Sequence, residues 1–389
     1  MKKKFETLAI RTQMERSDFL EHSTPLHLTS SFVFEDAEDM RASFAEEKQR
    51  NIYTRFTNPS NAEFIEKICL MEAAEDGVAF ATGMAAVFST FAALLKAGDH
   101  ILSSRSIFGS THSLFNNYFP KWNINTTYFD WNRPDLIEKA ITPTTKMIYV
   151  ESPTNPGVDI LDLKDLGKIA KKHNLLYVVD NCFATPYLQQ PIQFGADLVI
   201  HSATKLIDGQ GRVLGGVTVG SASLIREIFL FSRNTGPALS PFNAWVLSKS
   251  LETLAVRVDR HCANALLLAE KLENHPMINF VKYPFLRSHP QFEIAKKQMR
   301  QGGNIIAFEI EGGGTKATAF INAIKMCSIT SNLGDSRSIV THPASSTHSK
   351  LSSEEQLQVG ITPGLIRLSV GLEHIDDLWN DVEQALNSQ

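Results

Sequence analysis

Two apolar segments in the middle of the chain end in residues that could do chemistry. The segment YVVD ends at Asp180, and the segment DLVIHSATK leads through Ser202 and Thr204 to Lys205, with glycines following. A lysine amine can bind the aldehyde of pyridoxal 5′-phosphate (PLP) as a Schiff base, an aspartate can keep the pyridine nitrogen protonated, and small hydroxyl groups can bind the phosphate. These residue types in this order therefore indicate a PLP site.

Strand and helix patterns alternate around these residues. Short apolar segments at 78–83, 100–104, 126–130, 146–152 and 175–181 predict strands, while 84–98 and 162–174 predict helices, the second with Asp162 as its N-cap. This alternation predicts an α/β fold with a mostly parallel, doubly wound sheet. Ligands bind at the carboxyl ends of strands in such sheets, so we expect Asp180, Asn155 and Lys205 to share one crevice.

The chain outside this region divides into an arm and a second domain. The first fifty residues have few periodic runs and are interpreted as an extended arm. Residues 241–273 carry one long helical pattern, and the remainder mixes apolar strands at 304–312 and 365–371 with helices at 315–326 and 374–386. The prediction is an N-terminal arm (1–52), a large PLP-binding domain (53–245) and a smaller α+β C-terminal domain (246–389).

Composition narrows the class of protein. The 389 residues are 43% apolar and 21% charged, which is ordinary for a globular protein, and a net charge of -4 gives no basic face for nucleic acid. Residues 5–17 carry charges where a signal segment would be apolar, and no apolar run reaches transmembrane length. We expect a cytoplasmic enzyme without a membrane partner. The spacing of the four cysteines and twelve histidines predicts neither disulfides nor a metal site.

A further set of motifs runs along nearly the whole chain. They are YTRFTNPS from Tyr53, ATGMAA from Ala81, ESPTNP from Glu151, VVDNCFATP from Val178, HSATKLIDGQGR from His201, NLGDSRSIVTHPASSTH from Asn332 and PGLIRLSVGLE from Pro363. In these segments the chain resembles the Cys/Met-metabolism family of fold-type I PLP enzymes, which includes cystathionine synthases and lyases, methionine γ-lyase and the homoserine-ester sulfhydrylases. The resemblance implies a fold-type I PLP-dependent transferase.

The cofactor residues follow from side-chain chemistry together with this resemblance. Lys205 is expected to bind the cofactor and then to act as the base that moves protons on the substrate, and Asp180 to pair with the pyridine nitrogen. The phosphate is expected at the start of the helix after Thr82. Its predicted ligands are the backbone N–H groups of Gly83 and Met84 and the hydroxyl groups of Ser202 and Thr204.

In the family, the residues matching Tyr53 and Arg55 reach the phosphate from a neighbouring subunit, and Tyr53 is also counted as catalytic. The resemblance therefore implies a homo-oligomer, a dimer at least and a tetramer by expectation. The arm would wrap the neighbouring subunit.

Substrate binding is assigned to three residues. The arginine that matches Arg367 grips the α-carboxylate in the family, a contact that suits a guanidinium fork. Asn155 is expected on the ring hydroxyl or the carboxylate, although a turn asparagine before proline explains it nearly as well. Asn332 stands where the family often has serine.

The type of reaction is inferred from departures from the family pattern. Phe108 replaces the tyrosine that stacks on the cofactor ring, and Ser110 stands where methionine γ-lyases carry cysteine. Together with Asn332, these residues make the sequence resemble the sulfhydrylases of the family. Those enzymes convert O-succinylhomoserine and sulfide to homocysteine and succinate in methionine biosynthesis. Alternatives are a cystathionine γ-synthase, a methionine or cystathionine γ-lyase, and a catalytically silent regulatory protein on the same fold.

Overall fold

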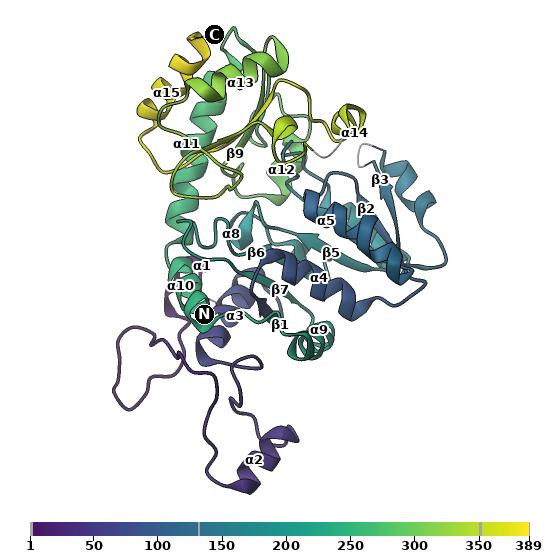
Figure 1. The fold of residues 1–389 in the computed structure, drawn as a ribbon, viewed down its shortest axis with the longest axis vertical. Helices are drawn as coiled ribbons and strands as arrows, with labels where there is room; N and C mark the ends of the chain where they lie inside the picture. Colours follow the sequence, from purple (N-terminus) through teal and green to yellow (C-terminus); the bar gives the residue numbers. More distant parts are fainter. Residues whose placement is uncertain (1–2, 131–132, 350–351, 389) are drawn as a thin grey trace.

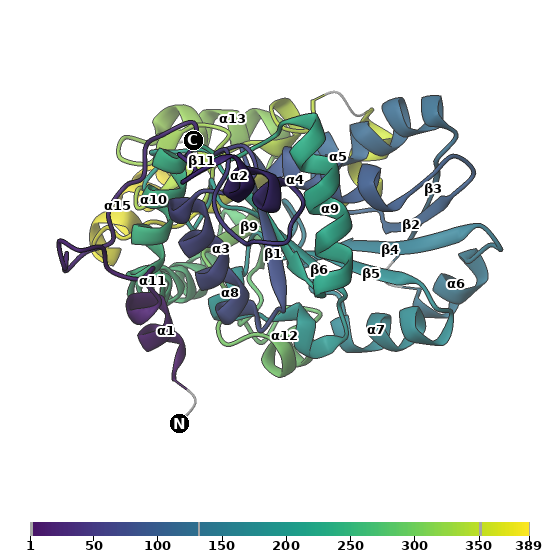
Figure 2. The same cartoon turned by 90° about the horizontal axis from the view of Figure 1, so that it is seen from below.

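The computed structural model describes residues 3–130, 133–349 and 352–388, and the chain is built around two β-sheets (Figure 1). The larger sheet has the order β1-β7-β6-β5-β4-β2-β3, and the strands from β6 to β3 follow one another across Figure 2. These strands are β1 (Asp76–Phe80), β2 (His100–Ser104), β3 (Asn125–Phe129), β4 (Thr145–Glu151), β5 (Leu176–Asp180), β6 (Leu198–Ser202) and β7 (Gly216–Gly220). All neighbours are parallel except that β7 runs antiparallel to β1 and β6.

Helices cover both faces of this sheet, and the sheet separates two hydrophobic cores, one on each face. One face carries α4 (Gly83–Leu94) and α9 (Ala222–Thr235), and the other carries α3 (Pro59–Glu72) and α7 (Leu163–Lys172). Neighbouring residues of a strand point to opposite faces, so Tyr149 packs under α4 while Val150 faces the other core. The predicted doubly wound α/β architecture is confirmed. Asp162 caps α7 as predicted, because its Oδ1 accepts from the Asp165 N–H at 3.0 Å.

The second sheet lies in the C-terminal part of the chain. Its order is β10-β11-β12-β9-β8, and most of its pairs are antiparallel. The strands are β8 (Ile278–Lys282), β9 (Ile305–Ile310), β10 (Ser328–Ile329), β11 (Ile339–Thr341) and β12 (Leu365–Ser369), and the helices α13 (Gly313–Ala323) and α15 (Ile375–Asn387) share their core. The smaller α+β domain is thus confirmed. All five residues of β12, including Arg367, are buried.

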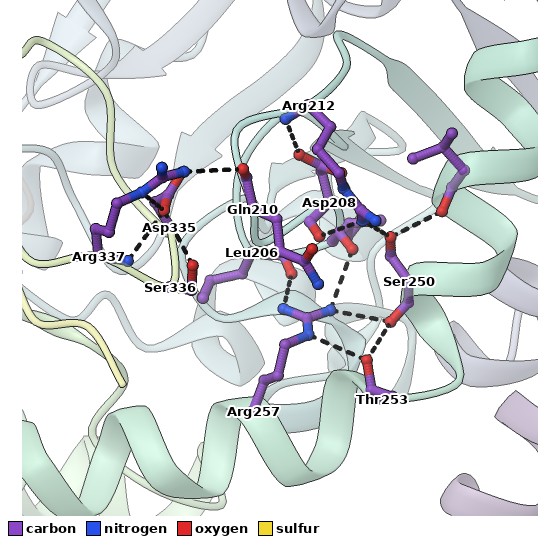
Figure 3. Close-up of polar contacts among 12 residues, drawn as sticks. Leu206, Asp208, Gln210, Arg212, Ser250, Thr253, Arg257, Asp335, Ser336 and Arg337 are labelled. Atoms are coloured by element: carbon purple, nitrogen blue, oxygen red, sulfur yellow. Dashed lines mark hydrogen bonds and ion pairs between the residues drawn. The ribbon is translucent and has the colours of Figure 1, made fainter. Parts of the chain in front are cut away.

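The helical pattern at 241–273 is interrupted, contrary to the prediction of one long helix. Two helices form there, α10 (Pro241–Leu251) and α11 (Leu254–Glu273). The Ser250 carbonyl accepts from the Thr253 N–H at 3.2 Å and from Arg257 Nη2 at 3.0 Å, which ends the first helix (Figure 3). The division at residue 245 stays a prediction.

The middle of the N-terminal arm extends away from the rest of the chain (Figure 1), whereas its start packs on the large domain, where the Phe5 and Tyr187 ring centroids lie 5.0 Å apart. It holds two short helices, α1 (Phe5–Arg11) and α2 (Ala37–Phe44). Phe19 and Val33 are 93% and 88% exposed, which is unusual for large apolar side chains. The base of the arm is fixed, because Glu63 accepts from the Met14 N–H at 3.0 Å and the Thr24 hydroxyl at 2.7 Å.

The remaining described helices are short: α5 (Gly109–Ser113), α6 (Pro134–Ile137), α8 (Thr185–Leu188), α12 (Phe292–Gln298) and α14 (Ser353–Gln358). A π-helical turn (Leu114–Tyr118) and 3-10 turns (Phe119–Trp122, Glu138–Ala140, Pro191–Phe194 and Pro343–Ser345) complete the set. Among the described residues, no helix is both long and apolar enough to cross a membrane.

Candidate active site

Lys205 lies just beyond the carboxyl end of β6, and its amine is held by a residue of the C-terminal domain. Lys205 Nζ donates to Asn332 Oδ1 at 2.7 Å. Burial lowers the pKa of the Lys205 amine, and the positive charge of Arg367 lowers it further. A lower pKa leaves more of the amine neutral near pH 7, so Lys205 is suited to act as a nucleophile and as a base.

Arg367 is linked to Lys205 through Asn332. Its Nη2 donates to the Asn332 carbonyl at 3.1 Å and to the Thr341 hydroxyl at 3.3 Å, and its Nη1 donates to Asn155 Oδ1 at 3.0 Å. Arg367 is only 1% exposed, and burial lowers its pKa to about 10. Its Nε is buried without a hydrogen-bond partner among the described residues. An unsatisfied guanidinium donor beside the lysine suits a ligand carboxylate.

Asp180 ends β5 next to a second buried acid that the sequence analysis did not select. Its Oδ1 accepts from the Cys182 N–H at 3.0 Å and its Oδ2 from the Tyr149 hydroxyl at 3.3 Å. The second acid, Glu151, ends β4 as the direct register partner of Asp180 and accepts from the Phe108 N–H at 2.7 Å. Burial raises the pKa of both carboxyl groups, and the charge of Asp180 raises the pKa of Glu151 further.

The signal for Glu151 was present in the sequence. Like Asp180, it is an acid that ends an apolar strand. Both residues must therefore lie at the same edge of a parallel sheet. No comparable sign of Tyr149 was present, because a tyrosine in an apolar strand is expected to pack in the hydrophobic core.

The start of α4 lies against the end of β6. Thr82 is the N-cap of α4, and its side chain accepts from the Ala85 N–H at 3.0 Å. A methyl group on Gly83 would lie 2.6 Å from the Ser202 Cβ, so this position requires glycine. The free N–H groups at the first turn of α4 and the Ser202 hydroxyl therefore meet at one place, as an anion-binding cup requires.

Two other predicted phosphate ligands have partners of their own. The Thr204 hydroxyl donates to the Gly215 carbonyl at 3.3 Å and accepts from the Gly215 N–H at 3.1 Å. The Met84 sulfur accepts from the Thr111 hydroxyl at 3.7 Å, so its side chain packs towards α5. The backbone N–H of Met84 is unaffected. The roles of Thr204 and Met84 as phosphate ligands stay predictions.

Tyr53 and Arg55 make their contacts elsewhere in the chain. Tyr53 forms a β-bridge with Ser31 of the arm and is 41% exposed. Arg55 Nη1 donates to the Arg233 carbonyl at the end of α9, and its guanidinium stacks on the Tyr53 ring. No contact in the described part of the chain joins either residue to Lys205. Their predicted place in a neighbouring subunit's site stays a prediction.

A buried histidine–glutamate pair adjoins the strand ends that carry Asp180 and Ser202, and the sequence did not predict it. His201 Nε2 lies 2.6 Å from Glu72 Oε1, and both side chains are fully buried. Asn181 Nδ2 donates to the same Glu72 oxygen at 2.9 Å. The pair joins α3 to β6 and to the residue after Asp180. Glu72 could not be found from sequence, because a glutamate at the end of a helix reads as solvated.

The donor set fits PLP. The site combines an amine of lowered pKa, a buried acid and an anion-binding helix start, and the Arg367 Nε has a free hydrogen-bonding position for a second anion. Lys205 would hold the aldehyde carbon, Asp180 the pyridine nitrogen, and Gly83 with Ser202 the phosphate. This set gives the aldehyde an amine, the pyridine nitrogen an acid and the phosphate a group of hydrogen-bond donors.

Comparisons with known proteins agree with this chemistry. A family model described as Cys/Met metabolism PLP-dependent enzyme matches residues 6–387. The chain is 47% identical to an O-succinylhomoserine sulfhydrylase of Pseudomonas aeruginosa, over 98% of this chain and 95% of the relative. It is 41% identical to an L-methionine gamma-lyase of Fusobacterium nucleatum, over 93% and 92%.

A solved structure from Campylobacter jejuni superimposes with a TM-score of 0.95 at 34% identity, over 98% of this chain and 99% of that one. That structure contains N′-pyridoxyl-lysine-5′-monophosphate, a cofactor joined to a lysine. The chain therefore belongs to the Cys/Met metabolism family of PLP-dependent enzymes.

Proposed function

We propose that the protein catalyses γ-replacement on an activated homoserine ester, in which O-succinylhomoserine and sulfide give homocysteine and succinate. The observation that carries this proposal is Phe108. Its N–H donates to Glu151 beside Asp180, and its side chain is 41% exposed at the sheet edge where the cofactor residues meet. The aromatic residue at this place has no hydroxyl group, so it can neither donate nor accept a proton.

The lack of a hydroxyl group favours a leaving group that needs no proton. A carboxylate such as succinate has a conjugate-acid pKa of about 4, whereas a thiolate has one of about 8.5 or more. Expelling a thiolate from methionine or cystathionine benefits from a general acid, which typically contributes about 10²- to 10⁴-fold. Expelling succinate does not. Sulfide is already partly ionised near neutral pH, so the incoming nucleophile needs no dedicated base either.

The remaining steps fall to a small set of side chains. PLP, when bound, supplies an electron sink that makes the α-hydrogen of an amino acid acidic. Lys205, with its lowered pKa, takes the proton from Cα and moves protons at Cβ, while Arg367 fixes the α-carboxylate through its free Nε. Asn332 accepts from Lys205 Nζ and so can hold the amine ready between these steps.

We also propose that the active site is completed by a second copy of the chain, with Tyr53 and Arg55 reaching the phosphate and Tyr53 acting beside Lys205. Support comes from where these two residues lie in their own chain. They contact the arm and the end of α9, and no contact in the described part of the chain joins them to Lys205. A dimer is the minimum, and a tetramer and a cytoplasmic location remain expectations.

Product analysis tests the proposed reaction. The purified enzyme is given O-succinyl-, O-acetyl- or O-phosphohomoserine with sulfide and cysteine together, and methionine alone in a separate reaction. We expect homocysteine from the succinyl ester as the main product. Predominant cystathionine would instead identify a synthase, and rapid 2-oxobutyrate release from methionine would identify a γ-lyase, the activity of the 41% identical relative.

Two variants of Phe108 sharpen this test. Phe108→Tyr adds only a hydroxyl group and should raise methionine elimination relative to ester replacement. Phe108→Leu removes the ring but adds no hydroxyl, so it should lower both activities without changing their ratio. An unchanged ratio in Phe108→Tyr would contradict the argument from the leaving group.

A further inference from the structure

Lys205 lies in a tight turn, and only some of the backbone carbonyl groups of this turn accept hydrogen bonds from the turn itself. The Gly209 N–H donates to the Lys205 carbonyl at 2.8 Å, and the Asp208 N–H donates to the Ala203 carbonyl at 2.9 Å. The next two carbonyls, those of Leu206 and Ile207, accept from outside the turn. The position of the lysine therefore depends on the group that binds these two carbonyls.

That group is Arg257, the fourth residue of α11. Its Nη1 donates to the Leu206 carbonyl at 2.8 Å, and its Nη2 donates to the Ile207 carbonyl at 3.3 Å and to the Ser250 carbonyl at 3.0 Å (Figure 3). Its Nε lies 3.3 Å from the Thr253 hydroxyl oxygen. One planar guanidinium thus joins the lysine turn to the break between α10 and α11.

Arg257 differs from an ordinary buried ion-pair residue. It is 7% exposed, and burial lowers its pKa to about 10. The nearby carboxylate, Asp208, is held by Arg212, whose backbone N–H and Nη2 lie 2.7 Å and 3.0 Å from its oxygens. A buried charge is costly, and here its hydrogen bonds go to main-chain carbonyls that lie directly after the lysine.

The turn is shaped to receive this guanidinium. Gly209 has a φ of +69°, and a methyl group there would overlap Arg257 Nη1. On its other side the turn meets the segment that carries Asn332. A methyl group on Gly334 would lie 2.7 Å from the Leu206 nitrogen, and the Ser336 N–H donates to the Gly209 carbonyl at 2.9 Å.

We propose that Arg257 is a positioning residue for Lys205. Arg257 holds the Leu206 and Ile207 carbonyls, which directly follow Lys205. It thereby fixes the position at which Lys205 Nζ contacts Asn332 Oδ1 and would reach the aldehyde carbon of the cofactor. The proposal rests on the role of Lys205 in the proposed function. A lysine in place of Arg257 keeps the charge but loses the fork, so it cannot hold both carbonyls and Ser250 together.

The test separates the position of the lysine from the integrity of the phosphate cup. Cofactor-free wild type and Arg257→Lys are given PLP or pyridoxamine 5′-phosphate, which has the same ring and phosphate but no aldehyde. Capture of the aldehyde by the amine, which releases one water, is followed by visible absorbance and by borohydride trapping at Lys205. Binding of the pyridoxamine form is followed by equilibrium dialysis.

We expect Arg257→Lys to slow aldehyde capture and to shift the pH midpoint of the visible absorbance, while pyridoxamine 5′-phosphate binds as tightly as to wild type. The kcat of the loaded enzyme should fall by on the order of 100-fold with little change in KM, as expected for a misplaced catalytic group. Arg212→Lys is the matched control, because Arg212 belongs to the same cluster but contacts neither the Leu206 nor the Ile207 carbonyl. It should leave capture unchanged.

Equal weakening of both cofactor forms, or no change in capture, would overturn the positioning role. If Arg257→Lys does not fold, Thr253→Val decides the question. It removes the Nε contact and the bond from the Thr253 hydroxyl to the Ser250 carbonyl but leaves the guanidinium on the Leu206 and Ile207 carbonyls, so it should slow capture less but in the same direction. A failure of the proposed function is recognised separately, since wild type itself would then not be trapped at Lys205 or would not form homocysteine.

Discussion

The Arg367→Lys variant is expected to lose substrate affinity and to keep its cofactor. The guanidinium holds Asn155 with Nη1 and the Asn332 carbonyl with Nη2, and it leaves Nε free for a ligand. An ammonium group cannot make the two fixed contacts and still present a donor in the same plane. Losing one charge-assisted hydrogen bond to a carboxylate costs about 1.5–3 kcal/mol, which corresponds to about 10- to 150-fold in affinity.

The assay compares steady-state kinetics for O-succinylhomoserine with cofactor dissociation measured by absorbance. We expect the KM to rise within that range while cofactor dissociation changes little. Thr341→Val is the control, because it removes a 3.3 Å acceptor of Arg367 without touching the charge or the fork, and its effect should be smaller. An unchanged KM and kcat in Arg367→Lys would refute the carboxylate role.

Four other predictions concern the cofactor residues. Lys205→Ala should abolish homocysteine release while phosphate binding persists, and release near the wild-type rate would disprove the assignment. Asp180→Asn should keep the cofactor but slow exchange of the α-proton, which proton NMR in heavy water measures; full exchange would remove Asp180 from the role. Mixing inactive Lys205→Ala and Arg55→Ala chains should restore some sites, and no recovery after verified subunit exchange would argue for a site within one chain. Because burial lowers the pKa of Lys205, labelling of its amine in the cofactor-free chain should reach half its maximal rate at a lower pH than labelling of free lysine, and an equal midpoint would contradict this.

The fold and the cofactor could be predicted because their signals are local. Apolar runs that end in Asp180 and Ser202 identify neighbouring strand ends, and the N-cap Asp162 marks a helix start, so the doubly wound sheet and the PLP chemistry followed from short segments. The direction of β7 was not predicted. Its run GVTVG has no feature that distinguishes a parallel from an antiparallel neighbour.

The contacts that tune the site could not be predicted because they join residues far apart in sequence. Asn332 was selected as a substrate residue, but its hydrogen bond to Lys205 spans 127 residues and depends on how the two domains meet. The break between α10 and α11 was missed for a different reason, because no residue type marks it in the sequence. The apolar periodicity continues through it, whereas the Ser250 carbonyl is taken by Arg257 in three dimensions.

If a second copy covers the exposed arm, as proposed, the stability and activity of the protein depend on its concentration. Phe19, Leu20, Leu28 and Val33 are between 70% and 93% exposed in the single chain, and large apolar side chains are costly to leave in water. In the proposed dimer, a second copy that covers these side chains would bind only the folded chain, so by mass action the melting temperature should rise with protein concentration. Dilution would then inactivate the enzyme before it unfolds, and concentrating the sample would restore activity without any refolding step.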